Sequence, residues 1–356
     1  MYAVIMAGGR GTRFWPLSRE KNPKHLLNIT GDKTILETTI ERIKPLIPEN
    51  YTYIITGESH VRTVIDHCGK VPRENIIIEP IGRNTAPCIG LAATYIKQKD
   101  PDAVMVVLPA DHLIFNEERF LDNLTVAADM ARKERHLITV GIRPTKPETA
   151  YGYIEEGTVA ATIRGKEVYR VRSFREKPDR ETARQFLDAG RFFWNSGMFI
   201  WRVSTILDAI EEFLPKLHQG LTSIAAALGT DRERNVIEAV YNDVEPLSID
   251  YGVMEKAKDV ILIKGDFGWN DIGSWDALFE IFSRDGAGNS FKGNVIAVDS
   301  QNSLVYSPDK LVTLIGVSDL VVVETDDALL ICRRDNSQDV KDVVEILKAK
   351  GLKDYV

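Results

Sequence analysis

This sequence has few cysteines, no long apolar run and no strong excess of one charge. Cys68, Cys88 and Cys332 show no CxxC spacing, which argues against a zinc site and against a disulfide framework. No apolar run reaches ~18 residues and no signal-peptide pattern opens the chain, so we expect no membrane partner. The formal net charge of −7 over 356 residues argues against a nucleic-acid partner. These absences favour a cytoplasmic protein in which any anion-binding site is local.

Up to about residue 142, short apolar runs alternate with amphipathic stretches of helical length. The runs expected to form buried strands are Tyr2–Met6, Tyr51–Thr56, Asn75–Glu79, Ala103–Leu108 and Leu137–Gly141. The expected helices are Thr34–Lys44, Ser59–His67, Thr85–Gln98 and Glu117–Lys133. This alternation predicts an α/β, Rossmann-like domain with a mixed, mostly parallel central sheet. Ligands bind such sheets at the carboxyl ends of the strands, which directs attention to the loops after Met6 and Leu108.

The remainder of the chain is less regular. Aromatic strands in YGYIEEG, VYRVRSFREKP and RFFWNSGMFIW are separated by helices near Arg180–Asp188 and Thr205–Leu217, and we interpret them as an insertion that completes the pocket. After the glycine-rich break Asp285–Ser290 come five strand candidates, Asn294–Val298, Ser303–Ser307, Leu311–Val317, Leu320–Thr325 and Leu329–Arg333, and a helix, Gln338–Lys350. They predict a small all-β module, either a roll or the start of a β-helix. We expect domains at 1–285 and 291–356, the second serving stability or assembly more than chemistry.

The stretch MAGGRGTRFWPLSREKNPKHLL, Met6 to Leu27, is unusually rich in glycine and positive charge. Gly8, Gly9 and Gly11 allow backbone N–H groups to approach an anion closely. The cations of this stretch are Arg10, Arg13, Arg19, Lys21 and Lys24. The pattern predicts a phosphate cradle, with a tight turn and a solvated charged face as the alternative. Phe14 stands where a dinucleotide motif needs its third glycine, and no Walker A motif is present.

This loop, together with the motifs that follow it, resembles the sugar-nucleotide pyrophosphorylases. The segments EPIGRNTAPCIGLAA, VVLPADHLI, YGYIE, FREKPD, WNSGMFIW, SIDYGVMEKA and GWNDIGSW occur in the order of that family and extend over nearly the whole chain. The resemblance is greatest to the branch that converts GTP and mannose 1-phosphate into GDP-mannose and pyrophosphate. Two positions depart from the family pattern, since His25 replaces a glutamine and Cys88 a small alanine.

The resemblance implies a role for individual residues. Arg13 and Lys24 would be the catalytic cations, and Asp111 and Asp271 would hold Mg²⁺, as one ion or two. The nucleotide-binding residues would be Gly8, Gly9, Gly11, Thr12, Glu79, Arg83, Asn84, Thr85, Pro109 and Ala110. The sugar-phosphate-binding residues would be Gly152, Glu176, Lys177, Asn195, Gly197 and Asp250. By analogy we also expect a homodimer.

Purely structural interpretations of the same residues stay open at this point. Lys24 could be a solvated lysine, Asp271 the N-cap of a helix starting near Ser274, and Asn84-Thr85 a plain helix start. Glu176 and Lys177 could form an exposed pair worth under ~1 kcal/mol. Two other functions also stay open. One is a pyrophosphorylase for another hexose 1-phosphate and nucleotide, and the other is a non-catalytic, nucleotide-binding regulatory relative.

Overall fold

The computed structural model describes residues 1–9, 11–29 and 31–356, so Arg10 of the opening loop lies outside the described residues. The chain forms two compact units. Unit 1 comprises Met1–Gly8, Glu37–Ala110 and Ile114–Trp269, and unit 2 comprises Gly9–Leu36, Asp111–Leu113 and Asn270–Val356. From Gly9 onward, the opening loop therefore groups with the C-terminal residues rather than with unit 1, to which the preceding residues Met1–Gly8 belong. The expected division into residues 1–285 and 291–356 stays a prediction.

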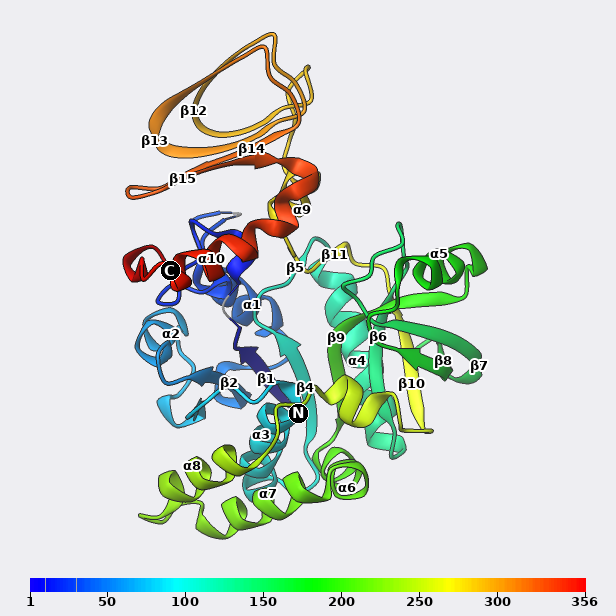
Figure 1. Ribbon diagram of the computed structural model, residues 1–356. Coiled ribbons are helices and arrows are strands. Elements are labelled where there is room, and N and C mark those ends of the chain that lie inside the picture. Colours follow the sequence, from blue (N-terminus) through cyan, green and yellow to red (C-terminus); the bar gives the residue numbers. More distant parts are fainter. Residues whose placement is uncertain (10, 30) are drawn as a thin grey trace. The chain divides into compact units, whose positions relative to one another are not determined.

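Unit 1 is built on a nine-stranded sheet with the order β3-β2-β1-β4-β9-β6-β10-β8-β7 (Figure 1). Its strands are β1 (Tyr2–Ala7), β2 (Thr52–Gly57), β3 (Ile76–Glu79), β4 (Val104–Pro109), β6 (Leu137–Ile142), β7 (Tyr153–Ile163), β8 (Lys166–Arg175), β9 (Phe192–Arg202) and β10 (Val260–Gly265). Strands β1 to β4 are parallel, β10 is parallel to β6, and β9 runs antiparallel to both β4 and β6. The predicted mixed α/β sheet is confirmed. Strand β9 is buried on both faces, which explains how an aromatic-rich segment takes a central position.

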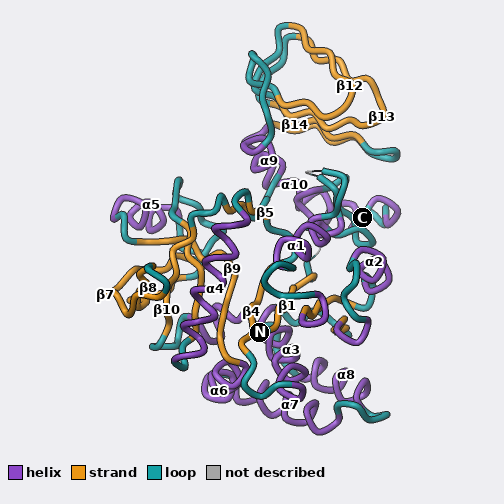
Figure 2. The backbone as a smooth tube through the Cα atoms, turned by 180° about the vertical axis from the view of Figure 1, so that it is seen from behind, coloured by secondary structure: helices purple, strands orange, loops and turns teal. Residues whose placement is uncertain are grey.

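Helices cover this sheet on both faces (Figure 2). The helices that lie wholly or mostly in unit 1 are α1 (Ile35–Ile43), α2 (Val61–His67), α3 (Thr85–Lys99), α4 (Glu117–Lys133), α5 (Arg180–Ala189), α6 (Val203–Phe213), α7 (Pro215–Ala227) and α8 (Glu233–Asp243), with a π-helical turn at Asp250–Met254. Helix α3 packs on β1 and β2 and is itself covered by α6 and α7. Its buried side chains join those of the sheet in one apolar core.

Two details of the middle region differ from the sequence-based expectation. The single helix expected over Thr205–Leu217 is broken into α6 and α7, because Leu214 precedes a proline and leaves the helical region (φ −135°, ψ 57°). Pro215 then takes the first position of α7, where its missing N–H costs nothing. Helix α8 was not predicted at all, although Ile237 and Tyr241 have the i, i+4 spacing of a buried helix face.

The C-terminal part of unit 2 is a small sheet with the order β12-β13-β14-β15. Its strands are β12 (Ser290–Val298), β13 (Leu304–Ile315), β14 (Leu320–Glu324) and β15 (Leu329–Arg333). The first three are parallel and follow one another along the chain, as the coils of a β-helix do, and β15 returns antiparallel. Two of the expected strands are merged in β13, which shifts register where it passes Gly293 and Val295 of β12. The unit also contains α9 (Trp275–Ile281) and α10 (Val340–Ala349).

The remaining short strands are β5 (Leu113–Ile114) and β11 (Trp269–Asn270), and each lies where the chain passes from one unit to the other. Among the described residues, no helix is long and apolar enough to cross a membrane.

A single apolar core joins the opening loop to the β module within unit 2. Trp275 is fully buried, its ring centroid lies 5.2 Å from that of Phe14 and 6.1 Å from that of Tyr306, and its Nε1 donates to the carbonyl of Trp15 at 3.1 Å. Leu304, Val321 and other module residues belong to the same core. The module thus supports the loop that carries the predicted catalytic cations. The expectation that it serves stability or assembly more than chemistry stays a prediction.

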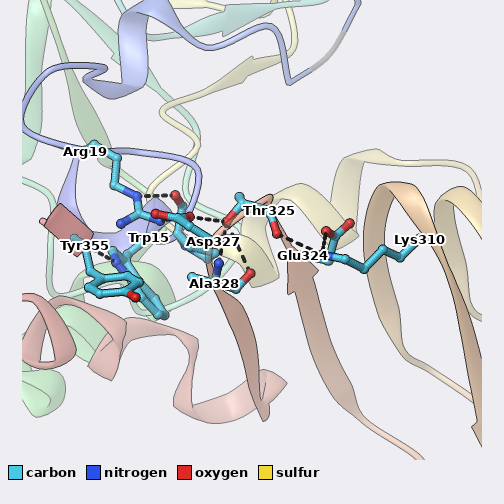
Figure 3. Close-up of polar contacts among 9 residues, drawn as sticks. Trp15, Arg19, Lys310, Glu324, Thr325, Asp327, Ala328 and Tyr355 are labelled. Atoms are coloured by element: carbon cyan, nitrogen blue, oxygen red, sulfur yellow. Dashed lines mark hydrogen bonds and ion pairs between the residues drawn. The ribbon is translucent and has the colours of Figure 1, made fainter.

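Polar contacts reinforce this packing (Figure 3). Arg19 of the opening loop pairs with Asp327, in the turn between β14 and β15, at 2.8 Å. The Nε1 of Trp15 donates to the carbonyl of Tyr355 at 2.8 Å, next to the last residue of the chain. The loop is thus held by two other parts of unit 2, the turn between β14 and β15 and the C-terminal residues.

We predict that Trp275→Ala destabilises the protein by about 3–5 kcal/mol, because it leaves a large cavity and removes a buried hydrogen bond. The measurement is the free energy of unfolding from urea titration. Ile315→Ala is the control, since this side chain is 68% exposed and its loss is expected to cost under ~0.5 kcal/mol. Similar destabilisation by both variants would contradict the proposed role of this core.

Candidate active site

The backbone of the opening loop is shaped around Lys24. Gly11 has left-handed dihedrals (φ 59°, ψ 34°), and a Cβ placed on it would lie 2.5 Å from the Cβ of Lys24. Only glycine is compatible with that approach. Gly9 also has a positive φ of 93°, whereas a Cβ on Gly8 or Gly9 would meet nothing within 4 Å. The space beside these two glycines is thus open to a ligand.

Lys24 connects three segments that are far apart in the sequence. Its side chain is only 8% exposed, and its Nζ lies 2.9 Å from Oδ2 of Asp111, which follows the end of β4. The same ammonium donates to the backbone carbonyl of Asp271 and lies 5.8 Å from the ring centroid of Phe14. The interpretation of Lys24 as a solvated lysine is wrong. The structure instead brings Lys24 to both residues that were predicted to bind metal.

Charge controls the protonation of Asp111. Burial alone would raise the pKa of this carboxyl, but the Lys24 ammonium and, to a smaller extent, His112 and His25 lower the pKa to about 2. Asp111 is therefore an anion at neutral pH. An anionic, partly exposed carboxylate is suited to hold a hard cation.

Asp271 lies in a strained turn rather than at a helix cap. Ser274 is the N-cap of α9, and its hydroxyl accepts from the N–H of Ala277 at 3.3 Å, so the interpretation of Asp271 as the cap is wrong. Ile272 has a positive φ of 45°, which is rare for a β-branched residue. Its N–H donates to Oδ1 of Asn270 at 2.7 Å, which helps to hold the turn. Such strain is often found where a side chain must be presented to a ligand.

The donor set at this place fits Mg²⁺. Among the described residues no group of three or more His, Cys, Asp or Glu is arranged to hold a metal. Mg²⁺ needs fewer protein ligands, because it keeps waters and takes phosphate oxygens as further ligands. Lys24 already places a cation on a carboxylate oxygen of Asp111 and on the backbone carbonyl oxygen of Asp271. These two aspartates are the residues that would hold the ion.

Arg13 lies in the short 3-10 turn Thr12–Phe14 and is half-buried. It forms no ion pair among the described residues, so its guanidinium is available for a phosphate. Thr12 begins this turn and is also half-buried. Their predicted roles in catalysis and nucleotide binding stay predictions.

The predicted sugar-phosphate residues gather in unit 1 around Asn195 of β9. The side-chain oxygen of Asn195 accepts from Thr139 at 3.3 Å and from the N–H of Gly197 at 3.1 Å. This fixes the orientation of the amide, whose nitrogen donates to Oδ1 of Asp250 at 2.7 Å. Thr139 was not predicted, since one threonine in an apolar strand gives no signal. Burial, and next the nearby Glu176 carboxylate, raises the pKa of Asp250 to about 6.

Glu176 extends the same cluster. A Cβ on Gly152 would lie 2.2 Å from Oε2 of Glu176 and 3.2 Å from the Cβ of Asn195, so a larger residue here would displace the Glu176 carboxylate. Oε2 of Glu176 is buried without a hydrogen-bond partner, whereas Oε1 pairs with Lys177 at 2.6 Å. Burial would lower the pKa of Lys177, but this bond to Glu176 raises it. Because the Glu176 side chain is only 7% exposed, the interpretation as an exposed pair is wrong for the carboxylate. A buried acceptor without a donor favours a bound ligand that carries hydroxyl groups.

The loop that begins α3 docks on the segment before Asp250. The N–H of Leu247 donates to the carbonyl of Arg83 at 3.1 Å, and the N–H of Ile249 donates to Oγ1 of Thr85 at 2.8 Å. Asn84 is the N-cap of α3, which confirms the interpretation as a helix start, and it has the unusual dihedrals φ 70° and ψ −171°. The loop is therefore held, under strain, next to Glu176, Asn195 and Asp250, which we call the sugar cluster after their predicted role.

Arg83 points to the end of α8 rather than into open space. Its Nε donates to the carbonyl of Tyr241 at 2.6 Å, where the C-terminus of a helix favours a cation. The hydroxyl of Tyr241 donates to Oε1 of Glu79 at 3.0 Å. Burial raises the pKa of Glu79 to about 7. Both side chains are thus engaged in holding the loop, and their predicted contact with the nucleotide stays a prediction.

The other predicted nucleotide residues of unit 1 lie at the end of β4. The N–H of Ala110 donates to the carbonyl of Met6 at 3.1 Å. The Cγ of Pro109 lies 3.5 Å from where a Cβ on Gly197 would be. The end of β4 thus contacts both the sugar cluster and the end of β1.

Comparison with known proteins agrees with this geometry. Residues 2–287 match the nucleotidyl transferase family, and residues 293–347 match a β-helix domain described as MannoseP isomerase/GMP-like. Mannose-1-phosphate guanylyltransferase of Escherichia coli is 42% identical over 99% of this chain and 75% of its own length. The chain belongs to the mannose-1-phosphate guanylyltransferase family of nucleotidyl transferases.

Further relatives of this family support the assignment. A mannose-1-phosphate guanylyltransferase of Klebsiella pneumoniae is 41% identical, again over 99% of this chain and 75% of its own length. A crystal structure from Thermus thermophilus, described as mannose-1-phosphate geranyltransferase, has a TM-score of 0.87 and 35% identity and covers 98% of this chain and 99% of its own. The family predicted from the sequence, its fold and its nature as an enzyme are confirmed.

The raised pKa of Glu79 leads to a prediction about stability and pH. The unfolded carboxyl ionises near its usual value of 4.5 but the folded one only near 7, so the folded state binds more protons between these values. The wild type is therefore expected to lose stability relative to Glu79→Gln as pH rises from 4.5 to 7, by roughly 1–3 kcal/mol, with no further change above that range. Urea midpoints at pH 4.5, 6 and 8 measure the difference. Glu118→Gln, on the exposed surface of α4, is the control, and a pH-independent difference for Glu79→Gln would contradict this prediction.

Proposed function

We propose that this protein joins GTP and mannose 1-phosphate to give GDP-mannose and pyrophosphate. The observation that carries the proposal is the meeting of Lys24, Asp111 and Asp271, three residues of the family motifs, at one place in unit 2. The Glu176–Asn195–Asp250 cluster in unit 1 supports a hydroxyl-rich second substrate, because carboxylates and amides bind sugar hydroxyls.

The reaction needs charge neutralisation more than proton transfer. The second pKa of a phosphate monoester is ~6, so mannose 1-phosphate is mostly a dianion at pH 7 and needs no general base. One of its oxygens attacks the α-phosphorus of GTP in line. The new P–O bond forms as the bond from the α-phosphorus to the oxygen bridging to the β-phosphate breaks, and pyrophosphate leaves.

Each group of residues has a part in this step. Arg13 grips phosphate oxygens bidentately and stays charged throughout. The N–H groups beside Gly8, Gly9 and Gly11 line the nucleotide phosphates, and Asp111 and Asp271 would hold Mg²⁺. Bound Mg²⁺ would neutralise charge on the triphosphate. The sugar hydroxyls would bind to Oε2 of Glu176 and to Asp250, whose place is fixed by Asn195.

The first test is a substrate panel. Purified protein with Mg²⁺ and either mannose 1-phosphate or glucose 1-phosphate is given GTP, ATP, UTP or dTTP, and pyrophosphate release is measured. We expect release with GTP alone and none after addition of EDTA. Strong turnover of glucose 1-phosphate with UTP, and none of mannose 1-phosphate, would replace this proposal by the alternative pyrophosphorylase, and silence with every pair would favour the regulatory relative.

Substitutions test the residue roles. Arg13→Ala and Asp111→Asn are each expected to lower kcat/KM by ~100-fold or more, as loss of a charge-stabilising group does. Lys21→Ala removes a positive charge from the same loop at an exposed position and is expected to change kcat/KM little. Circular dichroism checks that the variants are folded. Near-wild-type turnover of either active-site variant would refute the role given to that residue.

We also propose a homodimer in the cytoplasm, by analogy with the family. Size-exclusion chromatography with light scattering measures the mass in solution, and a value of about 40 kDa, the mass of one chain, would refute the dimer.

A further inference from the structure

The contacts of Lys24 raise a question about the order in which metal and nucleotide bind. An ammonium has three N–H donors. In this structure one contacts the carboxylate of Asp111 and another the carbonyl of Asp271, and the side chain runs over the ring of Phe14. A lysine so engaged and only 8% exposed is not extended toward an incoming phosphate.

The surrounding backbone fixes this arrangement. Gly11 leaves the space that the Lys24 side chain fills, since a Cβ there would lie 2.5 Å from that of Lys24. Ser18 Oγ donates to the carbonyl of Gly11 at 2.6 Å, which anchors the turn from the other side. Pro23 precedes the 3-10 turn Lys24–Leu26, and this turn fixes the backbone from which the Lys24 side chain extends. The ion pair is therefore built into the loop.

The partner of this ammonium is also the carboxylate that would hold the metal. A divalent cation approaching Asp111 meets a site that is already neutralised. Breaking a largely buried ion pair without a new partner for each charge is costly. A nucleotide changes this balance, because its phosphates offer Lys24 a new acceptor and give the metal further oxygen ligands.

We propose that Lys24 is a resident counter-ion that competes with the divalent cation for Asp111, so that the metal binds tightly only together with the nucleotide. This inference rests on the proposed function for the identity of the metal ligands. Lys24 then has two positions, on Asp111 in the free enzyme and on phosphate in the complex. By reciprocity, the nucleotide that tightens metal binding is itself tightened by the metal.

The experiment measures Mn²⁺ binding, by electron paramagnetic resonance of the free ion, to the protein without nucleotide. Lys24→Met removes the counter-ion and is expected to tighten Mn²⁺ binding by about tenfold or more, within the usual 5–150-fold range of coupling between sites. Lys24→Arg keeps a cation and is expected to bind Mn²⁺ as weakly as the wild type. Lys21→Met is the matched control, since it removes the same charge from an exposed position of the same loop. Mn²⁺ affinity of Lys24→Met equal to that of Lys21→Met would overturn the proposal.

A second measurement does not depend on the folding of Lys24→Met. If Lys24 blocks Asp111 in the free wild type, Asp111→Asn changes the weak Mn²⁺ affinity of the nucleotide-free protein by less than about twofold. With guanosine 5′-(α,β-methylene)triphosphate, which cannot release pyrophosphate, the same substitution is expected to weaken Mn²⁺ binding by ~10-fold or more. A large effect already without nucleotide would overturn the proposal.

These binding results are independent of turnover. Should the protein fail to use GTP with mannose 1-phosphate while both Mn²⁺ results hold, the proposed function falls and the counter-ion role stands. Turnover of GTP with mannose 1-phosphate, combined with unchanged Mn²⁺ affinity in Lys24→Met, would support the proposed function and refute the counter-ion role.

Discussion

The ion pair between Lys24 and Asp111 is the contact on which the proposed phosphate chemistry of this protein depends. It joins residues 87 positions apart, and the bond from the same ammonium to the Asp271 carbonyl spans 247 positions. The reaction concentrates negative charge from two phosphate-bearing substrates, so its site must hold cations that offset the repulsion between the substrate phosphates and the carboxylates of the protein. Lys24 is such a cation, because it is buried, bonds the Asp111 carboxylate and the Asp271 backbone carbonyl, and keeps Asp111 ionised.

The sugar cluster follows a different physical rule. Glu176 and Asp250 are two carboxylates close enough for Glu176 to raise the pKa of Asp250, although burial contributes more. Such an arrangement is costly unless something donates to the carboxylate oxygens. Asn195 donates to Asp250, and Lys177 to one oxygen of Glu176, which leaves Oε2 of Glu176 buried and unsatisfied. The unsatisfied acceptor lies where a substrate with several hydroxyl groups could donate a hydrogen bond to it and offset the cost of its burial.

Much of the fold could be predicted, because short apolar runs and helical spacing are local signals. The parallel strands, the β-helix-like module and Asp111 at the end of a strand were all accessible in this way. Helix α8 was missed although Ile237 and Tyr241 carry its signal, and with it the role of Tyr241 in holding Arg83 and Glu79. That Lys24 is buried could not be predicted, since its partners are fixed by tertiary contacts and the sequence around it looks solvated.

The grouping of the opening loop with the C-terminal module also escaped prediction, and it explains how a glycine-rich loop can be held in place. Glycines increase the conformational freedom of the unfolded loop, so ordering it costs more than ordering an average loop. Here the aromatic side chains of Phe14 and Trp15 pack into the core around Trp275, which β13 and β14 help to form. Arg19 adds an ion pair to Asp327. The module therefore stabilises the ordered loop, because the apolar area it buries offsets the entropy lost when the loop is fixed.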